Sequence, residues 1–169
     1  MANAEITKKA LATSLRQLME TIPFSKVSIS DICRHVGMSR KSYYYHFKDK
    51  YDIVIWIFQT ECYVKCNHLK PTAKFEKICT YLYDNRVFYA KILSANGQNA
   101  LSEYIAKALM QSISLLAEPN DSKAPSVFEF YKDALIISLR KWLTAYKTIT
   151  PDSYIHFLKQ IFDLSQIGG

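Results

Sequence analysis

The chain has 169 residues, of which 49% are hydrophobic, and this apolar content is enough for a folded core, so it excludes an intrinsically disordered protein. No apolar run approaches the roughly 18 residues needed to cross a bilayer. The first residues lack the basic and then apolar layout of a signal peptide. We therefore expect a cytoplasmic protein in which four cysteines are reduced thiols: Cys33, Cys62, Cys66 and Cys79.

The positive charge of the chain is concentrated near its N-terminus. The formal net charge is +7, and residues 1–50 contain nine Lys and Arg against four Asp and Glu, whereas residues 51–169 contain thirteen against eleven. An excess of basic residues suits a polyanionic partner. Its position in the first third of the chain is typical of a DNA-binding head joined to a near-neutral body.

Helices follow one another along the chain, because apolar residues recur at three- and four-residue steps and only 4 Gly and 5 Pro interrupt them. The first predicted helix covers residues 5–20 and ends before Pro23. Ser28, with Asp31 three residues later, predicts a capping box at the start of the second helix. Gly37 is expected to end that helix in the left-handed conformation.

Further helix starts follow. Ser39 predicts the N-cap of a short helix over residues 39–46, and Asp49 predicts the cap of a helix from about 50 to 67. Residues 87–89 form a short aromatic segment. Later helices are predicted over residues 71–83, 98–117, 126–146 and 151–165, with a break at Asn96–Gly97 and a loop from Glu118 to Pro125. The expected fold is all-α, with about nine helices and no strand.

Residues 28–50 contain two short helices joined by a turn with a glycine, which is the geometry of a helix-turn-helix. In this motif the second helix enters the major groove of DNA. Arg40, Lys41 and Ser42 fall in the first turn of that helix, from which side chains reach base edges. The DNA contacts expected from this segment are Ser28, Ser30, Ser39, Arg40, Lys41, Ser42, Tyr44, Tyr45, His46 and Lys50. One or both of Tyr43 and Phe47 are expected to pack in the core.

This segment resembles the TetR family of bacterial regulators. The resemblance lies in three ordered runs, Ser28-Ile29-x-Asp31-Ile32, Gly37-Met38-Ser39 and Tyr44-Tyr45-His46-Phe47-Lys48-x-Lys50, and covers about residues 5–60. It implies an N-terminal three-helix DNA-binding head, a C-terminal helical bundle that senses a small molecule or a protein co-regulator, and a homodimer that binds a DNA operator. It also implies a phosphate contact from Thr7 on the first helix.

Two features qualify the resemblance. Lys41 and Tyr43 stand where family members often have a small residue and Leu, so this chain is expected to read different bases. Phe88-Tyr89, residues 96–99 and Trp142 are similar to a DhaS-like subgroup of the family, which contains activators as well as repressors.

The same resemblance divides the chain into a DNA-binding domain, residues 1–48, and a regulatory and dimerisation domain, residues 49–169. The last two predicted helices each carry an apolar stripe that would bury inward in a monomer. The resemblance instead favours pairing the stripes of two copies as a four-helix bundle. The interface residues expected on that basis are Phe128, Tyr131, Leu135, Leu139, Trp142, Ile155, Leu158 and Phe162.

Two interpretations of the body remain open from the residues. Five aromatic residues either line an apolar ligand pocket or pack the core: Trp56, Tyr63, Tyr81, Tyr89 and Tyr104. Cys62, Cys66 and His68 carry groups that bind zinc, which makes a metal- or redox-responsive regulator the alternative function, although free cysteines are also common core residues. No motif typical of an enzyme is present in the sequence, and we expect neither catalysis nor a cofactor.

Overall fold

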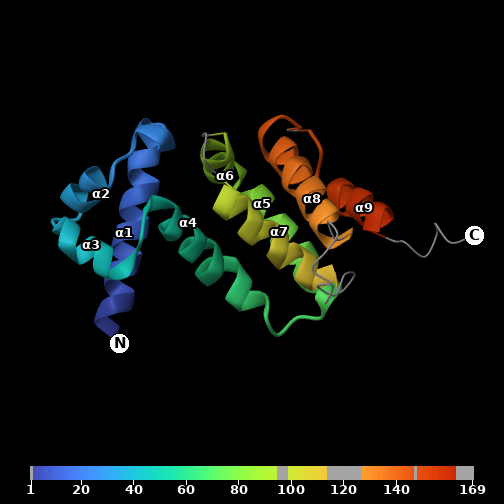
Figure 1. Cartoon of the computed structure of the whole chain (residues 1–169), viewed down its shortest axis with the longest axis horizontal. Coiled ribbons are helices and arrows are strands. Elements are labelled where there is room, and N and C mark those ends of the chain that lie inside the picture. The colour runs from blue at the N-terminus through green and yellow to red at the C-terminus, as the bar shows by residue number, and fades with distance from the viewer. Residues whose placement is uncertain (1, 95–98, 114–126, 147, 163–169) are drawn as a thin grey trace, which may run out of the picture.

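The computed structural model describes residues 2–94, 99–113, 127–146 and 148–162, and in these ranges every regular element is helical (Figure 1). The expected all-α fold is confirmed. The N-terminal elements are α1 (Ala2–Thr21), the 3-10 turn η1 (Phe24–Lys26), α2 (Ile29–His35), α3 (Arg40–His46) and α4 (Lys50–Phe58). A π-helical turn, η2 (Gln59–Tyr63), and a 3-10 turn, η3 (Val64–Cys66), follow α4. The remaining helices are α5 (Pro71–Asp84), α6 (Arg86–Leu93), α7 (Asn99–Ile113), α8 (Val127–Thr144) and α9 (Pro151–Phe162).

The predicted helix starts are confirmed by their capping hydrogen bonds. Ser28 Oγ accepts a hydrogen bond from the Asp31 amide at 3.1 Å, and the Asp31 carboxylate accepts one from the Ser28 amide at 3.0 Å. The hydrogen bonds from the Ser28 hydroxyl and amide lower the pKa of the Asp31 carboxyl. Ser39 and Asp49 cap α3 and α4, and Gly37 ends α2 with a φ of 68°.

One prediction of helix extent is corrected, and a segment that the sequence marks only as aromatic proves to be helical. The α-helical part of the predicted helix 50–67 ends at Phe58, beyond which the chain continues as η2 and η3. Residues 87–89 lie within α6, which packs against α8 and η1. A helix of 8 residues makes only about two turns, too few for its periodicity to stand out in the sequence. The predicted break at Asn96–Gly97 and the predicted loop Glu118–Pro125 lie outside the described residues.

The helices form two groups along the long axis of the molecule (Figure 1). We call α1, α2 and α3 the head, and the helices from α5 to α9 the body; α8 and α9 lie at the end farthest from α2 and α3. α4 joins the groups and packs against both α1 and α7. Because α4 contacts both sides, the boundary between residues 48 and 49 stays a prediction. None of the described helices is long and apolar enough to cross a membrane.

Candidate DNA-binding site

Helix α3 turns one face to the interior of the head and the other to solvent. Tyr43 and Phe47 are buried, with 6.1 Å between their ring centroids, so both pack in the core. Tyr45 is 84% exposed and Tyr44 is 50% exposed. Large aromatic rings left in water are available to a partner. The outward face of α3 is therefore the candidate surface for DNA.

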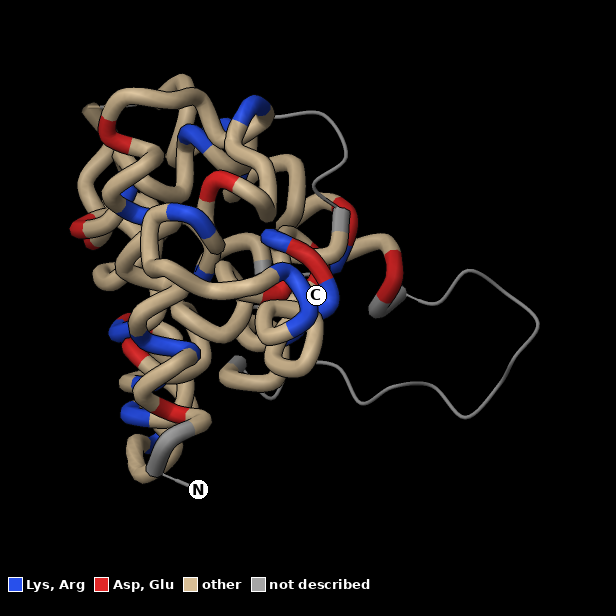
Figure 2. The backbone as a smooth tube through the Cα atoms, turned by 90° about the vertical axis from the view of Figure 1, so that its left-hand side faces the viewer, with Lys and Arg blue, Asp and Glu red and all other residues tan. Residues whose placement is uncertain are grey.

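The first turn of α3 carries exposed basic side chains. Arg40 and Lys41 are both exposed. Arg40 Nη2 lies 3.5 Å from the Tyr44 hydroxyl, and the guanidinium carbon lies 6.0 Å from the centre of that ring. The two side chains therefore lie side by side. Arg40 can donate hydrogen bonds, and the Tyr44 hydroxyl can both donate and accept them. Figure 2 looks onto the end of the molecule that carries α2 and α3, where the sequence places most of the excess of Lys and Arg.

Two serines of the predicted DNA contacts serve as helix caps. Ser28 Oγ also donates to Asp31 Oδ2 at 2.6 Å, and Ser39 Oγ accepts from the Ser42 amide at 3.1 Å. These hydroxyls are thus engaged in holding the two helices of the motif. The other predicted contacts differ in exposure: Ser30, Ser42, His46 and Thr7 are half-buried. Their roles toward DNA stay predictions.

Lys50 points into the head rather than out of it. Its ammonium donates to the backbone carbonyls of Phe24 at 2.7 Å, Ser25 at 3.2 Å and Val27 at 2.9 Å. The same nitrogen lies 4.6 Å from the centre of the Phe24 ring. Burial lowers the pKa of this ammonium. The sequence-based expectation of a phosphate contact does not agree with this orientation, because the donors are used within the chain.

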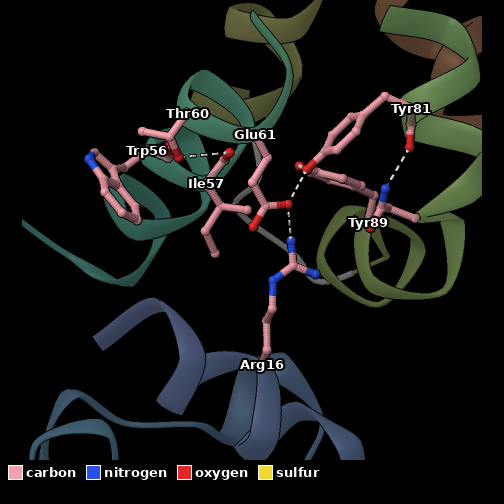
Figure 3. A network of polar contacts seen from close by, with 8 residues as sticks. Arg16, Trp56, Ile57, Thr60, Glu61, Tyr81 and Tyr89 are labelled. Carbon is pink, nitrogen blue, oxygen red and sulfur yellow. Dashed lines mark hydrogen bonds and ion pairs between the residues drawn. The ribbon is translucent and has the colours of Figure 1, made fainter. Parts of the chain in front are cut away.

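A polar network that the sequence analysis missed joins α1 to the body (Figure 3). Arg16 Nη2 donates to Glu61 Oε2 at 2.7 Å, and the Tyr81 hydroxyl donates to the same oxygen at 2.8 Å. The Tyr81 hydroxyl also lies 3.2 Å from that of Tyr89, which acts as the donor because the single Tyr81 proton goes to Glu61. Burial raises the pKa of Tyr81 and keeps its hydroxyl protonated. Because these partners are far apart along the chain, no local pattern in the sequence predicts their contact.

Of the five aromatic residues predicted to line a ligand pocket, four lie together and Trp56 lies apart from them. Trp56 packs against Phe47 of the head, with 6.0 Å between ring centroids. The rings of Tyr63, Tyr81 and Tyr104 instead surround Phe58 at 6.0 to 6.4 Å, and Tyr89 adjoins Tyr81. Hydrogen bonds fix two of the hydroxyls, because Gln59 Nε2 donates to Tyr104 at 2.8 Å and Tyr63 donates to Gln111 at 3.0 Å. Core packing accounts for these four rings.

Most residues predicted at the dimer interface are buried within the single chain. Leu135, Leu139, Trp142, Ile155 and Leu158 are at most 7% exposed, so they cannot form the surface that meets a partner. The reason is that α8 packs on α6 and α7, and α9 packs on α5, so the stronger apolar stripe of each helix faces the core of its own chain. Tyr131 is half-buried, and the side chains of Phe128 and Phe162 lie outside the described residues.

The cysteines do not form a metal centre in the described part of the chain. Cys62 and Cys66 are buried, whereas His68 is exposed. Burial, with a smaller effect of the Cys66 thiol, raises the pKa of Cys62 to about 12, which disfavours the thiolate that metals and oxidants require. Among the described residues no three His, Cys, Asp or Glu side chains gather so that they could hold a metal ion. Nothing therefore supports the metal- or redox-responsive alternative.

Comparison with known proteins places the chain in a family. A family model described as bacterial regulatory proteins of the tetR family matches residues 12–56, and a TetR model described as a transcriptional regulator C-terminal region matches residues 70–164. The HTH-type dhaKLM operon transcriptional activator DhaS of Lactococcus lactis subsp. lactis (strain IL1403) is 26% identical over 96 residues, which are 54% of this chain and 51% of that protein. The aligned region thus spans about half the length of this relative.

A solved structure of the dihydroxyacetone kinase operon activator DhaS shares the fold, with a TM-score of 0.58 and 18% identity over 96% of each chain. The family model for the C-terminal region alone covers more than half of the sequence. The head with its helix-turn-helix and the body with its five helices match the two regions of one family. The chain therefore belongs to the TetR family of transcriptional regulators, which bind DNA and are not enzymes.

Proposed function

We propose that the protein regulates transcription as a homodimer that binds a palindromic operator through α3 of each copy. The observation that carries the dimer is the exposed apolar face of α8 and α9, on which Phe130 is 71% exposed, Ile137 57% and Phe157 47%. A gathering of large apolar side chains in water marks a site of association. The helices α8 and α9 lie at the end of the molecule away from α3 (Figure 1), so a partner bound to them leaves both heads open to DNA.

A groove between α8 and α9 supports the same face as the interface. It has a volume of about 640 Å³ and is lined largely by apolar groups, among them Ile137, Tyr146 and Phe157. In a dimer with a two-fold axis, the apolar residues of each copy pack into the groove of the other copy. The interface therefore uses the outward sides of α8 and α9, not the buried stripes that the sequence suggested.

Control of the regulator follows from the geometry of two linked heads. Two recognition helices read successive major grooves when they are roughly 34–36 Å apart. We infer that a small molecule or a protein partner bound at the C-terminal domain favours a different spacing of the heads. The change in operator affinity is then set by how much more tightly this effector binds one spacing than the other. DhaS is an activator of the dhaKLM operon. By analogy with this relative, we propose that the present chain also controls an operon.

The dimer is tested by sedimentation equilibrium of Ile137→Asp and Phe157→Asp. A carboxylate buried at an apolar interface without a partner is strongly unfavourable, so both variants are expected to be monomers at concentrations at which the wild type is a dimer. Val87→Asp is the matched control, because Val87 is 69% exposed but lies on α6. Wild-type protein that sediments as a monomer, or both interface variants remaining dimers, would contradict the proposed interface.

The operator is tested by selecting bound duplexes from random DNA. A two-fold dimer is expected to recover an inverted repeat whose half-site centres are about 10 base pairs apart, or a multiple of that. The same selection with the monomeric Ile137→Asp variant is expected to recover single half-sites at lower affinity. An unsymmetrical site bound by the wild type would argue against the dimeric mode of reading.

A further inference from the structure

We propose that Lys50 is a positioning residue of the DNA-binding head, which ties the link between α1 and α2 to the start of α4, and that it is not a ligand of the DNA backbone. The inference rests on the DNA binding that belongs to the family and concerns how this chain holds its recognition helix. Its basis is the set of three hydrogen bonds from one ammonium to the carbonyls of Phe24, Ser25 and Val27.

The number of N–H donors on the ammonium decides between the positioning role and a phosphate contact. A lysine ammonium has three N–H groups and no acceptor. Three carbonyls within 3.2 Å of Nζ account for all three. The Phe24 ring, buried to 1% exposure, covers the same nitrogen at 4.6 Å. A phosphate can gain a hydrogen bond from this group only if a bond to a carbonyl is broken.

The carbonyls that Lys50 holds lie where three elements meet. Phe24 and Ser25 belong to η1, and Val27 directly precedes Ser28, the N-cap of α2. Lys50 itself is the first residue of α4, only three residues after Phe47, which follows α3. The ammonium therefore connects the start of α2 with the segment that leaves α3. Loss of this connection is expected to let the two helices of the motif shift relative to each other.

The test compares Lys50→Met, which keeps most of the aliphatic stem, with Lys48→Met, which removes the charge of an exposed lysine two residues away. Two quantities are measured: the melting temperature, and the affinity for two duplexes, one selected by the wild type from random DNA and one of unrelated sequence, over a range of salt concentrations. The Lys48→Met variant shows what the loss of one exposed positive charge near the site does to the salt dependence.

For Lys50→Met we expect a melting temperature lower by roughly 4–8 °C, because hydrogen bonds from a charged donor are lost. The slope of log K against log salt is expected to equal that of the wild type. At a temperature at which the variant is fully folded, the preference for the selected duplex is expected to fall several-fold. Loss of stability alone does not change that preference, so this readout separates positioning from a purely structural role.

Any one of three results with Lys50→Met would overturn the proposal. A slope less steep by about 0.9 in Lys50→Met shows that the ammonium neutralises a phosphate. A wild-type melting temperature or a wild-type preference shows that the carbonyl contacts do not position the head. Lys50→Arg adds a second variant that keeps the charge, but its planar fork does not match three converging carbonyls. We expect it to melt below the wild type with an unchanged slope, whereas a phosphate ligand predicts wild-type melting.

Discussion

Arg16 of α1 and Glu61 of the π-helical turn η2 form an ion pair, with 2.7 Å between Nη2 and Oε2, that links the head to the turn after α4 (Figure 3). π-helical turns are rare and occur frequently at functional sites. Here the turn immediately follows α4, the helix that joins the two groups of helices. The Glu61 carboxylate also accepts a hydrogen bond from the Tyr81 hydroxyl of α5. This one carboxylate therefore connects α1, η2 and α5.

The first prediction concerns the strength of this pair. The side chains of Arg16 and Glu61 are 30% and 43% exposed, so solvent screens their attraction. We expect a coupling energy of about 0.5–1 kcal/mol in a double-mutant cycle of Arg16→Met and Glu61→Gln, measured by urea unfolding. A parallel cycle on Lys159 and Glu76, each 46% exposed, is the control and is expected to show a smaller coupling. Equal coupling in the two cycles would remove any special role for Glu61.

The second prediction concerns the buried hydroxyl of Tyr43. Among the described residues it has no hydrogen-bond partner, and burial raises its pKa well above the usual range. Tyr43→Phe removes an unpaired polar group while keeping the ring, so the free energy of unfolding is expected to stay equal or rise by up to about 2 kcal/mol. Tyr81→Phe is the control, because it removes the hydrogen bond from the Tyr81 hydroxyl to Glu61 and the acceptor of the Tyr89 hydroxyl, and it is expected to destabilise. A clear loss of stability in Tyr43→Phe would contradict the assignment.

The third prediction concerns the turn between α2 and α3. Gly37 has a φ of 68°, and a Cβ added there meets no atom within 4 Å. The cost of Gly37→Ala is therefore conformational, about 1–2 kcal/mol, and a smaller cost is expected for Gly37→Asn, because Asn tolerates the left-handed region. Thermal unfolding of the two variants measures the difference. Equal melting of Gly37→Ala and the wild type would be inconsistent with this turn.

The fourth prediction concerns base reading by Arg40. It is exposed in the first turn of α3, beside Tyr44. Arg40→Ala is expected to relax the preference at one or two positions of each half-site, at a cost of about 1–3 kcal/mol there. Binding of the wild type and the variant to a panel of single-base changes in the selected operator measures this effect. A uniform weakening across the panel would instead assign Arg40 to the phosphates.

The fifth prediction concerns the thiols. All four cysteines are free and buried, and burial raises the pKa of Cys62 to about 12. Because the thiolate is the reactive form, we expect none of the four to react quickly with a disulfide reagent at neutral pH in the folded protein. Unfolding in urea is expected to expose all four. Rapid reaction of Cys62 or Cys66 in the folded protein would reopen the redox interpretation.

The position of the helix-turn-helix was predictable because its signals are local. Ser28, Ser39 and Asp49 each form their capping bonds with residues two or three positions further on. Gly37 ends α2 because glycine adopts a positive φ without steric cost, and this depends only on its own backbone. The inward side of α3 was also foreseen in Tyr43 and Phe47.

By itself, then, the sequence determined the helical class, the helix starts and the exposed basic turn of α3. Only the tertiary structure decided which way Lys50 points, which side of α8 and α9 meets solvent, and which residues join the head to the body. The physical reason is the distance along the chain between partners: a cap needs neighbours within one turn of helix. Lys50 meets carbonyls more than twenty residues away and Arg16 meets a carboxylate 45 residues away, and only the packed fold brings them together.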